Sequence, residues 1–346
     1  MEYTKLGRTD LNISQIGLGT MTWGWQNTQA QGFEQMDYAL AQGVNFFDTA
    51  EIYAIPPSPE RYGATETIIG NWFKDRGNRE NVILASKIAG PGMPWLRDGD
   101  NQINRRTVLA AVEGSLKRLQ TDYIDLYQLH WPNRGSYHFG KIWGFNPEFD
   151  AQAEEANFLE VLTVLNELIQ AGKIRHIGLS NETAWGINKW LQIAKDNNLP
   201  RIASIQNEYS LLCRHFEQDL SEIAMHEDVG LLAWSPLARG ILSGKYLNGA
   251  KPEGARLTLE TRPEHRVGPQ VDAATQQYIE IARNHGLDPC QMALAFVNQQ
   301  AFVSSTLIGA TNMDYLKTNI DSITLKLNQD VLADIQSVRR EYPVPF

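Results

Sequence analysis

Cysteine is scarce in this chain, which has only Cys213 and Cys290 among 346 residues. Two cysteines without a CxxC motif do not build a disulfide framework, and no cysteine and histidine spacing of the kind that holds zinc accompanies them. The isolated pair of Cys213 and His215 is more typical of packing than of a metal site. We therefore expect no structural metal and a reducing, cytoplasmic compartment.

Long apolar runs and a surplus of positive charge are also missing. No run reaches the roughly 18 residues of a membrane span, and the first residues lack a cationic segment followed by an apolar stretch, so neither secretion nor a membrane partner is expected. Lys and Arg number 31 against 40 Asp and Glu, which gives a formal net charge of −9. An acidic surface repels a phosphate backbone, so nucleic acid is not an expected partner.

The composition is that of a globular protein, with 42% hydrophobic and 21% charged residues, and it excludes collagen-like, low-complexity and disordered classes. Short β-branched or apolar runs alternate with stretches of helical periodicity. The expected strands cover residues 16–18, 44–48, 82–86, 124–130, 174–180, 203–206, 230–234 and 304–308. Eight alternations without a break in composition favour a single domain over residues 1–346, a (β/α)8 TIM barrel of the α/β class.

A doubly wound parallel sheet is the rival architecture. Its dinucleotide-binding form needs G-x-G-x-x-G directly after a strand, whereas the GLG at residues 17–19 lacks the third glycine. Two long stretches, residues 131–154 and 235–270, interrupt the alternation of strands and helices. Loops of that length in a compact domain are typical of lids or binding segments.

Four ionisable residues fall at or just beyond the ends of expected strands. Asp48 ends the second strand, Lys87 follows the third, His130 closes the fourth, and Tyr53 lies in the loop after Asp48. In a barrel these positions share the C-terminal rim, where barrel enzymes carry out their chemistry. Each residue alone is more often structural, as a helix cap or a solvated charge, but four on one rim indicate a catalytic site.

This set of side chains supports protonation of a polarised carbonyl group. Tyrosine has an ordinary pKa of about 10, so it donates a proton at neutral pH, and a nearby ammonium such as that of Lys87 lowers this pKa. Asp48 would keep the ammonium charged, and His130 would hydrogen-bond a substrate oxygen. None of the four attacks carbon strongly, so the electron pair must come from a cofactor, for which a hydride donor is the natural complement.

Five motifs in register resemble the aldo-keto reductase family. They are GLGT at 17–20, FDTAEIY at 47–53, DYIDLYQLH at 122–130, GKIRHIGLSN at 172–181 and WSPLARG at 234–240. The similarity runs from the first strand to Asn319, and LSGKYLNG at 242–249 is most similar to the bacterial Tas-like reductases and the potassium-channel β-subunit-like group. The resemblance implies a (β/α)8 barrel whose far end is plugged by an N-terminal hairpin at residues 2–6 and 12–14.

The resemblance also implies a role for each residue on the rim. Tyr53 would be the general acid and base, Lys87 and Asp48 would tune it, and His130 would orient the carbonyl group. These implied roles agree with those reached from the chemistry of the side chains.

The resemblance further implies NADP(H) as the cofactor. Ser180, Asn181 and Gln206 would hold the nicotinamide carboxamide, and Trp234 would stack on the nicotinamide ring. The full set of expected cofactor contacts is Thr20, Met21, Ser180, Asn181, Gln206, Trp234, Ser235, Pro236, Leu237, Ala238, Gly240, Ser243, Lys245, Arg256, Gly309, Thr311, Tyr315, Thr318 and Asn319.

The phosphate groups of the cofactor would be held by two segments. Residues 235–238 would wrap the pyrophosphate with backbone amides and a hydroxyl, while Lys245 and Arg256 would neutralise its charge. A helix starting at residues 309–312 and ending at Asn319 would offer its exposed N–H groups to a 2′-phosphate.

The adenine end departs from the family pattern at three positions. Gly309 stands where many relatives have a phosphate-binding Lys, Tyr315 where they have Arg or Gln, and Thr318 where the channel-like group has Glu. Lys317 or Arg256 would have to compensate. The expectation of NADP(H) over NAD(H) therefore rests mainly on the family.

Aromatic side chains of the rim loops predict an apolar mouth suited to aldehydes or ketones with hydrophobic bodies. These residues are Trp23, Trp25, Tyr53, Trp95, Trp131 and Trp143. Arg97, Arg134 and Lys141 lie in the same loops, where each is either solvated or a selector of a carboxylate or phosphate substituent. We expect a small-molecule carbonyl substrate, aromatic or aliphatic, and a monomer or small homo-oligomer.

Two other functions remain open at the level of sequence. One is a redox-sensing module that binds NADP(H) with little turnover and reports the state of the cofactor to a partner. The other is a barrel enzyme for phosphorylated sugars, an isomerase or aldolase, for which Gly309 and Lys87 are superficial matches. That second function leaves the expected nicotinamide contacts without a role, so hydride transfer accounts for more residues.

Overall fold

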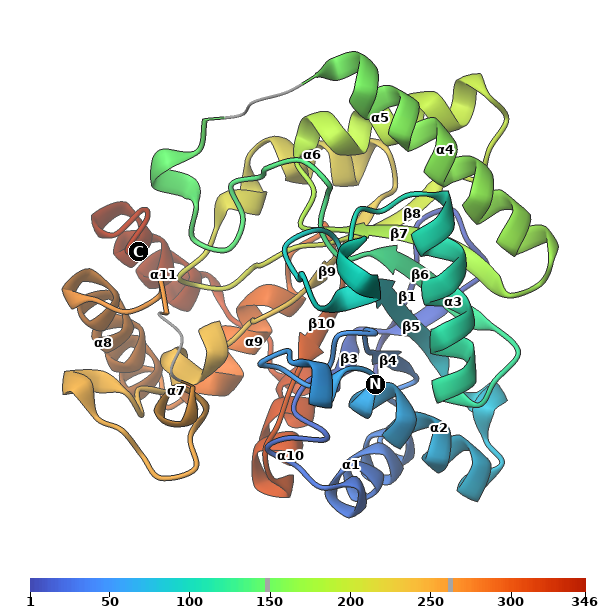
Figure 1. Ribbon diagram of the computed structural model, residues 1–346. Coiled ribbons are helices and arrows are strands. Elements are labelled where there is room, and N and C mark those ends of the chain that lie inside the picture. Colours follow the sequence, from blue (N-terminus) through green and yellow to red (C-terminus); the bar gives the residue numbers. More distant parts are fainter. Residues whose placement is uncertain (147–149, 261–263) are drawn as a thin grey trace.

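Within residues 1–146, 150–260 and 264–346, which the computed structural model describes, eight parallel strands close into a barrel (Figure 1). The order around the barrel is β10, β3, β4, β5, β6, β7, β8, β9, so each strand pairs with the next along the chain and the last closes on the first. The strands are β3 (Ile16–Gly19), β4 (Phe46–Asp48), β5 (Ile83–Ile88), β6 (Ile124–Leu129), β7 (Ile174–Ser180), β8 (Ile202–Gln206), β9 (Gly230–Ala233) and β10 (Val303–Ile308). The predicted (β/α)8 barrel is confirmed.

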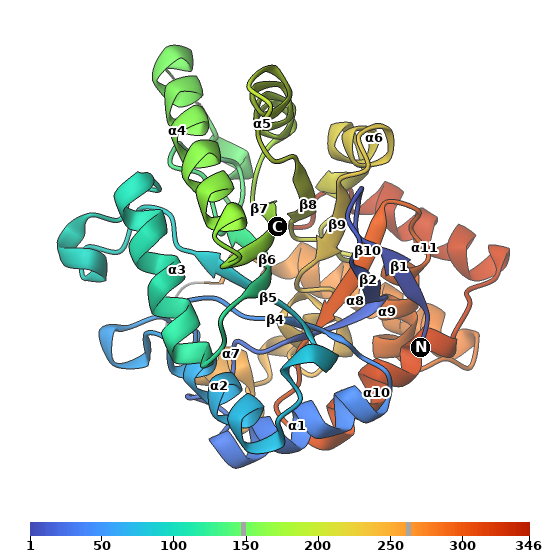
Figure 2. The same cartoon turned by 90° about the vertical axis from the view of Figure 1, so that its right-hand side faces the viewer.

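Helices lie in the connections and surround the strands (Figure 2). The α-helices are α1 (Gln29–Ala41), α2 (Ala64–Arg76), α3 (Arg105–Leu119), α4 (Ala151–Gln170), α5 (Ala184–Asp196), α6 (Asp219–His226), α7 (Arg256–Leu259), α8 (Pro269–Asn284), α9 (Pro289–Asn298), α10 (Met313–Asp321) and α11 (Gln329–Glu341). Short 3₁₀ helices are η1 (Pro59–Arg61), η2 (Arg79–Asn81), η3 (Leu96–Gly99), η4 (Ile142–Gly144), η5 (His215–Glu217), η6 (Ala238–Ser243), η7 (Leu247–Gly249) and η8 (Ser322–Thr324). Across the described ranges, no helix combines the length and apolar character that crossing a membrane requires.

The two long segments expected to be loops contain short helical turns. Residues 131–154 include η4 and the start of α4, and residues 235–270 include η6, η7, α7 and the start of α8. Parts of both segments, residues 147–149 and 261–263, lie outside the described residues.

Seven of the eight strands differ from their predicted bounds, and the largest differences, of two residues, occur at β4 next to the plug and at β5 next to the rim. β4 begins at Phe46 instead of residue 44, because Asn45 turns to the N-terminal segment and its Oδ1 accepts a hydrogen bond from the Ser14 backbone N–H at 2.7 Å. β5 extends to Ile88, so Lys87 lies inside the strand and does not follow it. The pairing with β6 continues through both residues, and an apolar sequence pattern does not report such pairing.

The strands β1 (Tyr3–Lys5) and β2 (Asn12–Ser14) form an antiparallel hairpin outside the barrel (Figure 2). Three apolar side chains of the hairpin pack against residues of six barrel strands. This cluster consists of Leu6, Leu11 and Ile13 with Phe46, Ala85, Leu126, Ala203, Leu232 and Leu307. The hairpin therefore plugs one end of the barrel, as the family resemblance implied.

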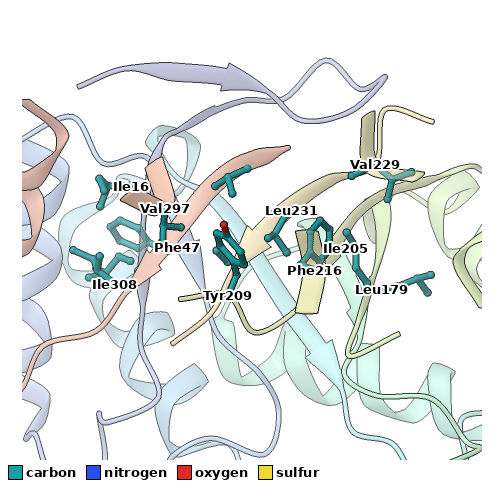
Figure 3. Packing of buried hydrophobic residues seen from close by; sticks show 14 of the residues in the cluster. Ile16, Phe47, Leu179, Ile205, Tyr209, Phe216, Val229, Leu231, Val297 and Ile308 are labelled. Atoms are coloured by element: carbon teal, nitrogen blue, oxygen red, sulfur yellow. The ribbon is translucent and has the colours of Figure 1, made fainter. Parts of the chain in front are cut away.

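A second and larger apolar cluster packs the barrel wall against the helices. Phe46 points to the plug, whereas Phe47 beside it belongs to this outer cluster, as expected from the alternation of side chains along a strand. Figure 3 shows part of the outer cluster, with Ile16, Phe47, Leu179, Ile205, Tyr209, Phe216, Val229, Leu231, Val297 and Ile308 labelled. Apolar packing thus fills the wall and the plugged end, and the opposite rim is left for polar groups.

We expect Ile13→Ala to lower the free energy of unfolding by about 2–5 kcal/mol, because it removes a fully buried side chain from the plug. Lys5→Ala, at an exposed position of the paired strand, should stay within about 0.5 kcal/mol of wild type. Urea unfolding followed by circular dichroism measures both variants. Equal and small effects of the two substitutions would contradict a packed plug.

Candidate active site

Four ionisable side chains meet at the C-terminal rim of the barrel. Asp48 is the last residue of β4, and Tyr53 lies in the loop that follows. Lys87 precedes the last residue of β5, and His130 directly follows β6. Because the strands are parallel, their carboxyl ends open on the same rim, and the structure brings the four residues together there.

The Lys87 ammonium joins a carboxylate to a phenol. Lys87 has no exposed surface. Its Nζ donates to Asp48 Oδ2 at 2.6 Å and to the Thr49 carbonyl at 2.8 Å. A longer contact of 3.5 Å reaches the phenolic oxygen of Tyr53, and Nζ lies 5.0 Å from the centre of the Tyr53 ring.

Burial and charge act in opposite directions on the pKa values of these groups. Burial is the largest single effect on the pKa of Lys87 and lowers it, but the interactions with Asp48 and Tyr53 together outweigh burial, so the pKa is raised above its ordinary value. Burial raises the pKa of Tyr53, and the opposing charge of Lys87 does not cancel this effect. The expectation of a lowered Tyr53 pKa is therefore wrong, because desolvation is larger than the attraction of the ammonium. Both side chains are protonated at neutral pH.

His130 lies against Tyr53, with ring centres 5.7 Å apart in an edge-on arrangement. Burial lowers its pKa well below the ordinary value and the charge of Lys87 lowers it further, so the imidazole is neutral at neutral pH. Its Nδ1 is buried and, within the described residues, has no hydrogen-bond partner. A buried polar atom of this kind calls for a partner that the protein itself does not supply.

Two glutamines, on β6 and β8, support the ion pair. Gln206 Nε2 donates to Asp48 Oδ1 at 2.8 Å and to Gln128 Oε1 at 3.1 Å. Gln128 Nε2 also donates to Asp48 Oδ1, at 3.1 Å. Sequence reasoning gave Gln206 only a cofactor contact and missed Gln128. The available signal was a polar residue inside an otherwise largely apolar strand, two positions before His130.

Ser180, Asn181 and Trp234 stand at the carboxyl ends of β7 and β9. Ser180 Oγ donates to the Gln206 carbonyl at 2.8 Å, and Asn181 Nδ2 donates to the His130 carbonyl at 2.8 Å. In the part of the chain that the structure describes, Asn181 Oδ1 and Trp234 Nε1 are buried without partners. Unsatisfied polar atoms beside an aromatic ring fit the carboxamide and ring of a nicotinamide.

Phe139, in the loop after β6, is a further aromatic residue at this rim and was not foreseen. Its ring stacks on Trp234 with centres 5.9 Å apart, and Trp131 meets it edge-on at 6.3 Å. Phe139 is 47% exposed, so Trp234 has an aromatic neighbour that solvent can reach. The only signal in the sequence was its place in the long segment 131–154, which was expected to be a binding segment.

Thr20 and Met21 follow β3 and border the same rim. Thr20 Oγ1 donates to the Asp48 carbonyl at 2.9 Å. Met21 packs against the apolar cluster that contains Tyr53, and its Sδ lies 3.8 Å from Arg256 Nη1. Both residues therefore lie where the sequence placed them, although Thr20 is bonded to the protein backbone.

The segment after β9 has an unusual backbone that suits an anion. Positive φ angles occur at Ser235, Ala238, Arg239 and Gly240. Turns of this kind gather backbone N–H groups into a concavity, a common geometry for phosphate binding. Pro236 and Leu237 lie between these turns, and Ser243 Oγ closes the segment by donating to the Gly240 carbonyl at 2.7 Å.

Arg256 and Lys245, to which the sequence gave one role, occupy different places. Arg256 Nε pairs with Glu260 Oε1 at 2.9 Å near the barrel rim, and burial lowers its pKa to about 10. Lys245 Nζ lies 5.2 Å from the ring centre of Tyr315 on α10, and burial lowers its pKa. Lys245 is therefore the cation that faces the segment expected to hold the adenine end.

The helix of that segment begins and ends later than predicted. α10 spans Met313–Asp321, whereas the sequence suggested a start at residues 309–312 and an end at Asn319. Asn312 is the cap, and its Oδ1 accepts from the Tyr315 backbone N–H at 2.9 Å. A side chain at Gly309 would meet no atom within 4 Å among the described residues, so this position is open.

The other expected contacts near α10 bond within the protein. The Thr311 carbonyl accepts from Asn27 at 2.9 Å, and the Thr318 carbonyl accepts from Gln291 at 3.2 Å. Asn319 Nδ2 donates to the Gly309 carbonyl at 3.3 Å. The expected cofactor residues thus lie in three places: at the rim around Asp48, in the segment after β9 and on the segment of α10.

The aromatic residues expected at the mouth are separated by the structure. Trp95 and Trp131 pack against the apolar cluster of Tyr53. Trp23 is fully buried in the core, so its expected place at the mouth is wrong. Trp143 is 74% exposed. Its position in a loop near the rim did not reveal whether its ring faces the barrel.

Two arginines of the mouth loops are committed to carboxylates. Arg97 pairs with Glu51, its Nη1 lying 2.8 and 2.9 Å from the two oxygens. Arg134 pairs with Glu182, and both members are almost fully buried. Because of these pairs, neither arginine is free to select a charged substrate, which the sequence had left open for both.

Comparisons with known proteins agree with this fold. The aldo/keto reductase family model matches residues 15–340. The chain is 51% identical to Protein tas of Escherichia coli (strain K12), over 100% of this chain and 99% of that protein. It is 32% identical to the uncharacterized oxidoreductase YrpG of Bacillus subtilis, over 98% of this chain and 96% of that protein. It is 31% identical to a putative voltage-gated potassium channel subunit beta of Schizosaccharomyces pombe, over 98% and 93% of the two chains.

These matches span nearly the whole chain and agree with the five motifs and the closed barrel. They exclude the alternative function of a phosphosugar isomerase or aldolase. The chain belongs to the aldo-keto reductase family, oxidoreductases that in general reduce carbonyl groups with NAD(P)H.

Proposed function

We propose that this protein reduces aldehyde and ketone carbonyls to alcohols with NADPH, and that Tyr53 is the general acid. The observation that carries the proposal is the buried Lys87 ammonium, 2.6 Å from Asp48 and 3.5 Å from the Tyr53 oxygen. A protonated phenol beside a fixed cation is suited to protonating an oxygen on which negative charge develops.

Each side chain of the set has a separate task in this proposal. Tyr53 donates its phenolic proton to the carbonyl oxygen and takes it back in the reverse reaction. Lys87 stabilises the phenolate that remains, and Asp48 keeps the ammonium charged and in place. His130 is neutral because burial lowers its pKa, and it orients the carbonyl oxygen by a hydrogen bond.

The nicotinamide cofactor, when bound, supplies the hydride that the carbonyl carbon accepts. Asn181 and Ser180 would hold the carboxamide, and Trp234 would pack against the ring. Gln206 would contribute from the same rim, although its Nε2 is already bonded to Asp48. The backbone turns of residues 235–243 would hold the pyrophosphate.

Selection of NADP(H) over NAD(H) would depend on Lys245 in this proposal. Its ammonium lies beside Tyr315 in the first turn of α10, where the positive end of the helix dipole also favours an anion, although Asp314 lies in the same turn. Arg256 lies near the barrel rim and is paired with Glu260, so the proposal gives it no part in selecting between the two coenzymes. Lys317 lies on the side of α1, its Nζ 5.8 Å from the ring centre of Tyr38.

The substrate would be an uncharged carbonyl compound with an apolar body. Trp95 and Trp131 join Tyr53 in the apolar cluster at the mouth. Arg97 and Arg134 are neutralised by buried carboxylates. An apolar wall with few convergent polar groups is the usual form of a small-molecule site.

A second candidate function is an NADP(H)-binding module that senses redox state with little turnover. The similarity to a putative potassium channel subunit beta favours it. The complete set of Asp48, Tyr53, Lys87 and His130 favours turnover instead, because a binding module needs no proton donor. The two functions differ in the rate of NADPH oxidation, which the following experiment measures.

We expect Tyr53→Phe to lower kcat by about 10²–10⁴-fold, because it removes the proton donor and leaves the packing in place. Affinity for NADPH, measured by quenching of tryptophan fluorescence, should change by less than about twofold, because the Tyr53 hydroxyl is not one of the proposed cofactor contacts. The assay is NADPH oxidation with a panel of aromatic and aliphatic aldehydes. Tight NADPH binding without turnover by the wild type would favour the sensing module, and absence of any nicotinamide binding would contradict both functions.

We expect kcat/KM for the aldehyde to stay level between about pH 6 and pH 9, because the pKa of Tyr53 is raised above about 10 and that of His130 is well below about 6.5. Tyr53 loses its donor proton only as the pH rises through its raised pKa, and His130 gains charge only in acid. Initial rates across this range test the expectation. A decline of kcat/KM with a midpoint near pH 8, abolished by Tyr53→Phe, would contradict the expectation. It would show that the charge of Lys87 affects the pKa of Tyr53 more than burial does.

We expect Lys245→Met to weaken NADPH binding by about 10- to 100-fold and to leave NADH binding nearly unchanged, because one charge-assisted contact to the 2′-phosphate is lost. Lys317→Met is the matched control and should leave both affinities as in the wild type. Fluorescence titrations with each coenzyme measure the effect. Equal weakening of NADPH and NADH would instead assign Lys245 to the pyrophosphate.

A further inference from the structure

We propose that Glu51 is a positioning residue for the Tyr53 proton donor. Its buried carboxylate ties the segment that carries Tyr53 to the strand that carries Lys87 and to the wall of the mouth. The proposal rests on the proposed role of Tyr53 as the general acid. It adds a residue that touches neither substrate nor cofactor and acts through the geometry of the phenol and the ammonium.

The Glu51 carboxylate has no exposed surface and is bonded from three directions. Its Oε1 accepts from the Ala89 backbone N–H at 2.8 Å, and its Oε2 accepts from the Tyr62 hydroxyl at 2.7 Å. Arg97 Nη1 donates to both oxygens, at 2.8 and 2.9 Å. The donors come from the end of β5, the approach to α2 and the turn η3, which are distant along the chain.

Two of the bonds of Glu51 fix the spacing between the phenol and the ammonium. Glu51 lies two residues before Tyr53, and Ala89 lies two residues after Lys87. The Glu51 backbone N–H also donates to the Lys87 carbonyl, at 3.2 Å. Backbone and side chain of one residue thus hold the Tyr53 segment against the end of β5 at two points.

The contact between Lys87 and Tyr53 is sensitive to this spacing. At 3.5 Å from Nζ to the phenolic oxygen it is already at the long limit of a hydrogen bond. A displacement of about 1 Å at such a contact can reduce a rate by about 10²-fold. Loosening either point of attachment would therefore separate the donor from the cation that stabilises its phenolate.

Arg97 extends the same connection to the wall of the mouth. Its side chain is 12% exposed and also donates to the Ala89 carbonyl, at 3.3 Å. The neighbouring Leu96 belongs to the apolar cluster of Tyr53, and Trp95 packs against it. A buried ion pair of this kind adds little net stability compared with apolar packing, so its main consequence here is geometric.

A second buried carboxylate provides a matched control. Glu66 also has no exposed surface. Its Oε2 accepts from Arg118 Nε at 2.7 Å, and its Oε1 accepts from the Ser86 hydroxyl at 2.6 Å. Like Glu51 it is bonded by an arginine and a hydroxyl, but its carboxylate joins α2 to β5 and α3, and it meets the Glu51 cluster indirectly, through Arg118, which lies 4.8 Å from the ring centre of Tyr62.

The test is a double-mutant cycle with Glu51→Gln and Tyr53→Phe, measured as kcat and KM for an aldehyde and as affinity for NADPH. We expect Glu51→Gln to lower kcat by about 10- to 100-fold while KM and NADPH affinity change by less than about twofold. In the Tyr53→Phe background the same substitution should change kcat by less than about twofold, because the residue through which it acts is already removed. Glu66→Gln should leave kcat within about twofold of wild type at comparable loss of thermal stability.

The outcomes separate this proposal from the one it rests on. Equal losses of kcat in both backgrounds, or none in either, would overturn the positioning role of Glu51. Full activity of Tyr53→Phe alone would overturn the proposed function itself. If Glu51→Gln does not fold, Arg97→Met and Arg97→Lys replace it. Arg97→Met should then lower kcat by about tenfold with KM unchanged, and Arg97→Lys should restore only part of the rate, because lysine keeps the charge but not the two N–H groups that reach Glu51 and the Ala89 carbonyl.

Discussion

A lysine that is cut off from water needs a counter-charge, and the bond between Lys87 and Asp48 supplies it. Lys87 has no exposed surface, and its Nζ lies 2.6 Å from Asp48 Oδ2. Breaking such a pair from one side destabilises a protein by about 3–5 kcal/mol. The other oxygen of Asp48 accepts hydrogen bonds from Gln128 and Gln206. Groups from three other strands of the barrel thus depend on one carboxylate, and the proton chemistry proposed for Tyr53 depends on the same pair.

The closed barrel makes this convergence possible. Lys87 lies opposite Gln128 in the register of β5 and β6, and Ser180 lies opposite Gln206 in that of β7 and β8. A slip of one residue in either register would turn these side chains to the other face of the wall. The hairpin fills the far end of the barrel with apolar side chains, so the polar groups gather at the opposite rim.

Paired charge also shapes the surroundings of the rim. The chain is acidic overall, with a formal net charge of −9, yet several arginines lie near the mouth. Arg97 and Arg134 are each bound by a buried glutamate, which leaves the mouth apolar in character. Lys245 differs from these arginines, because its ammonium contacts the aromatic ring of Tyr315 on α10. Anionic groups of a cofactor would therefore be drawn toward the side of α10.

The sequence by itself determined the eight-fold alternation and the positions of Asp48, Tyr53 and His130 around strand ends, because apolar periodicity and strand ends are local properties and parallel strands carry their ends to one rim. It did not determine that β5 continues past Lys87, because backbone pairing with β6 extends a strand beyond its apolar pattern.

The tertiary structure alone decided which partners the buried groups have. The pKa of Tyr53 is raised because burial, which no local pattern reports, outweighs the nearby ammonium. Gln128 and Glu51 were missed because their partners lie far away along the chain. Long-range hydrogen bonds and desolvation arise only when the chain is closed into a barrel, and for that reason the sequence indicated the candidate site but not its electrostatics.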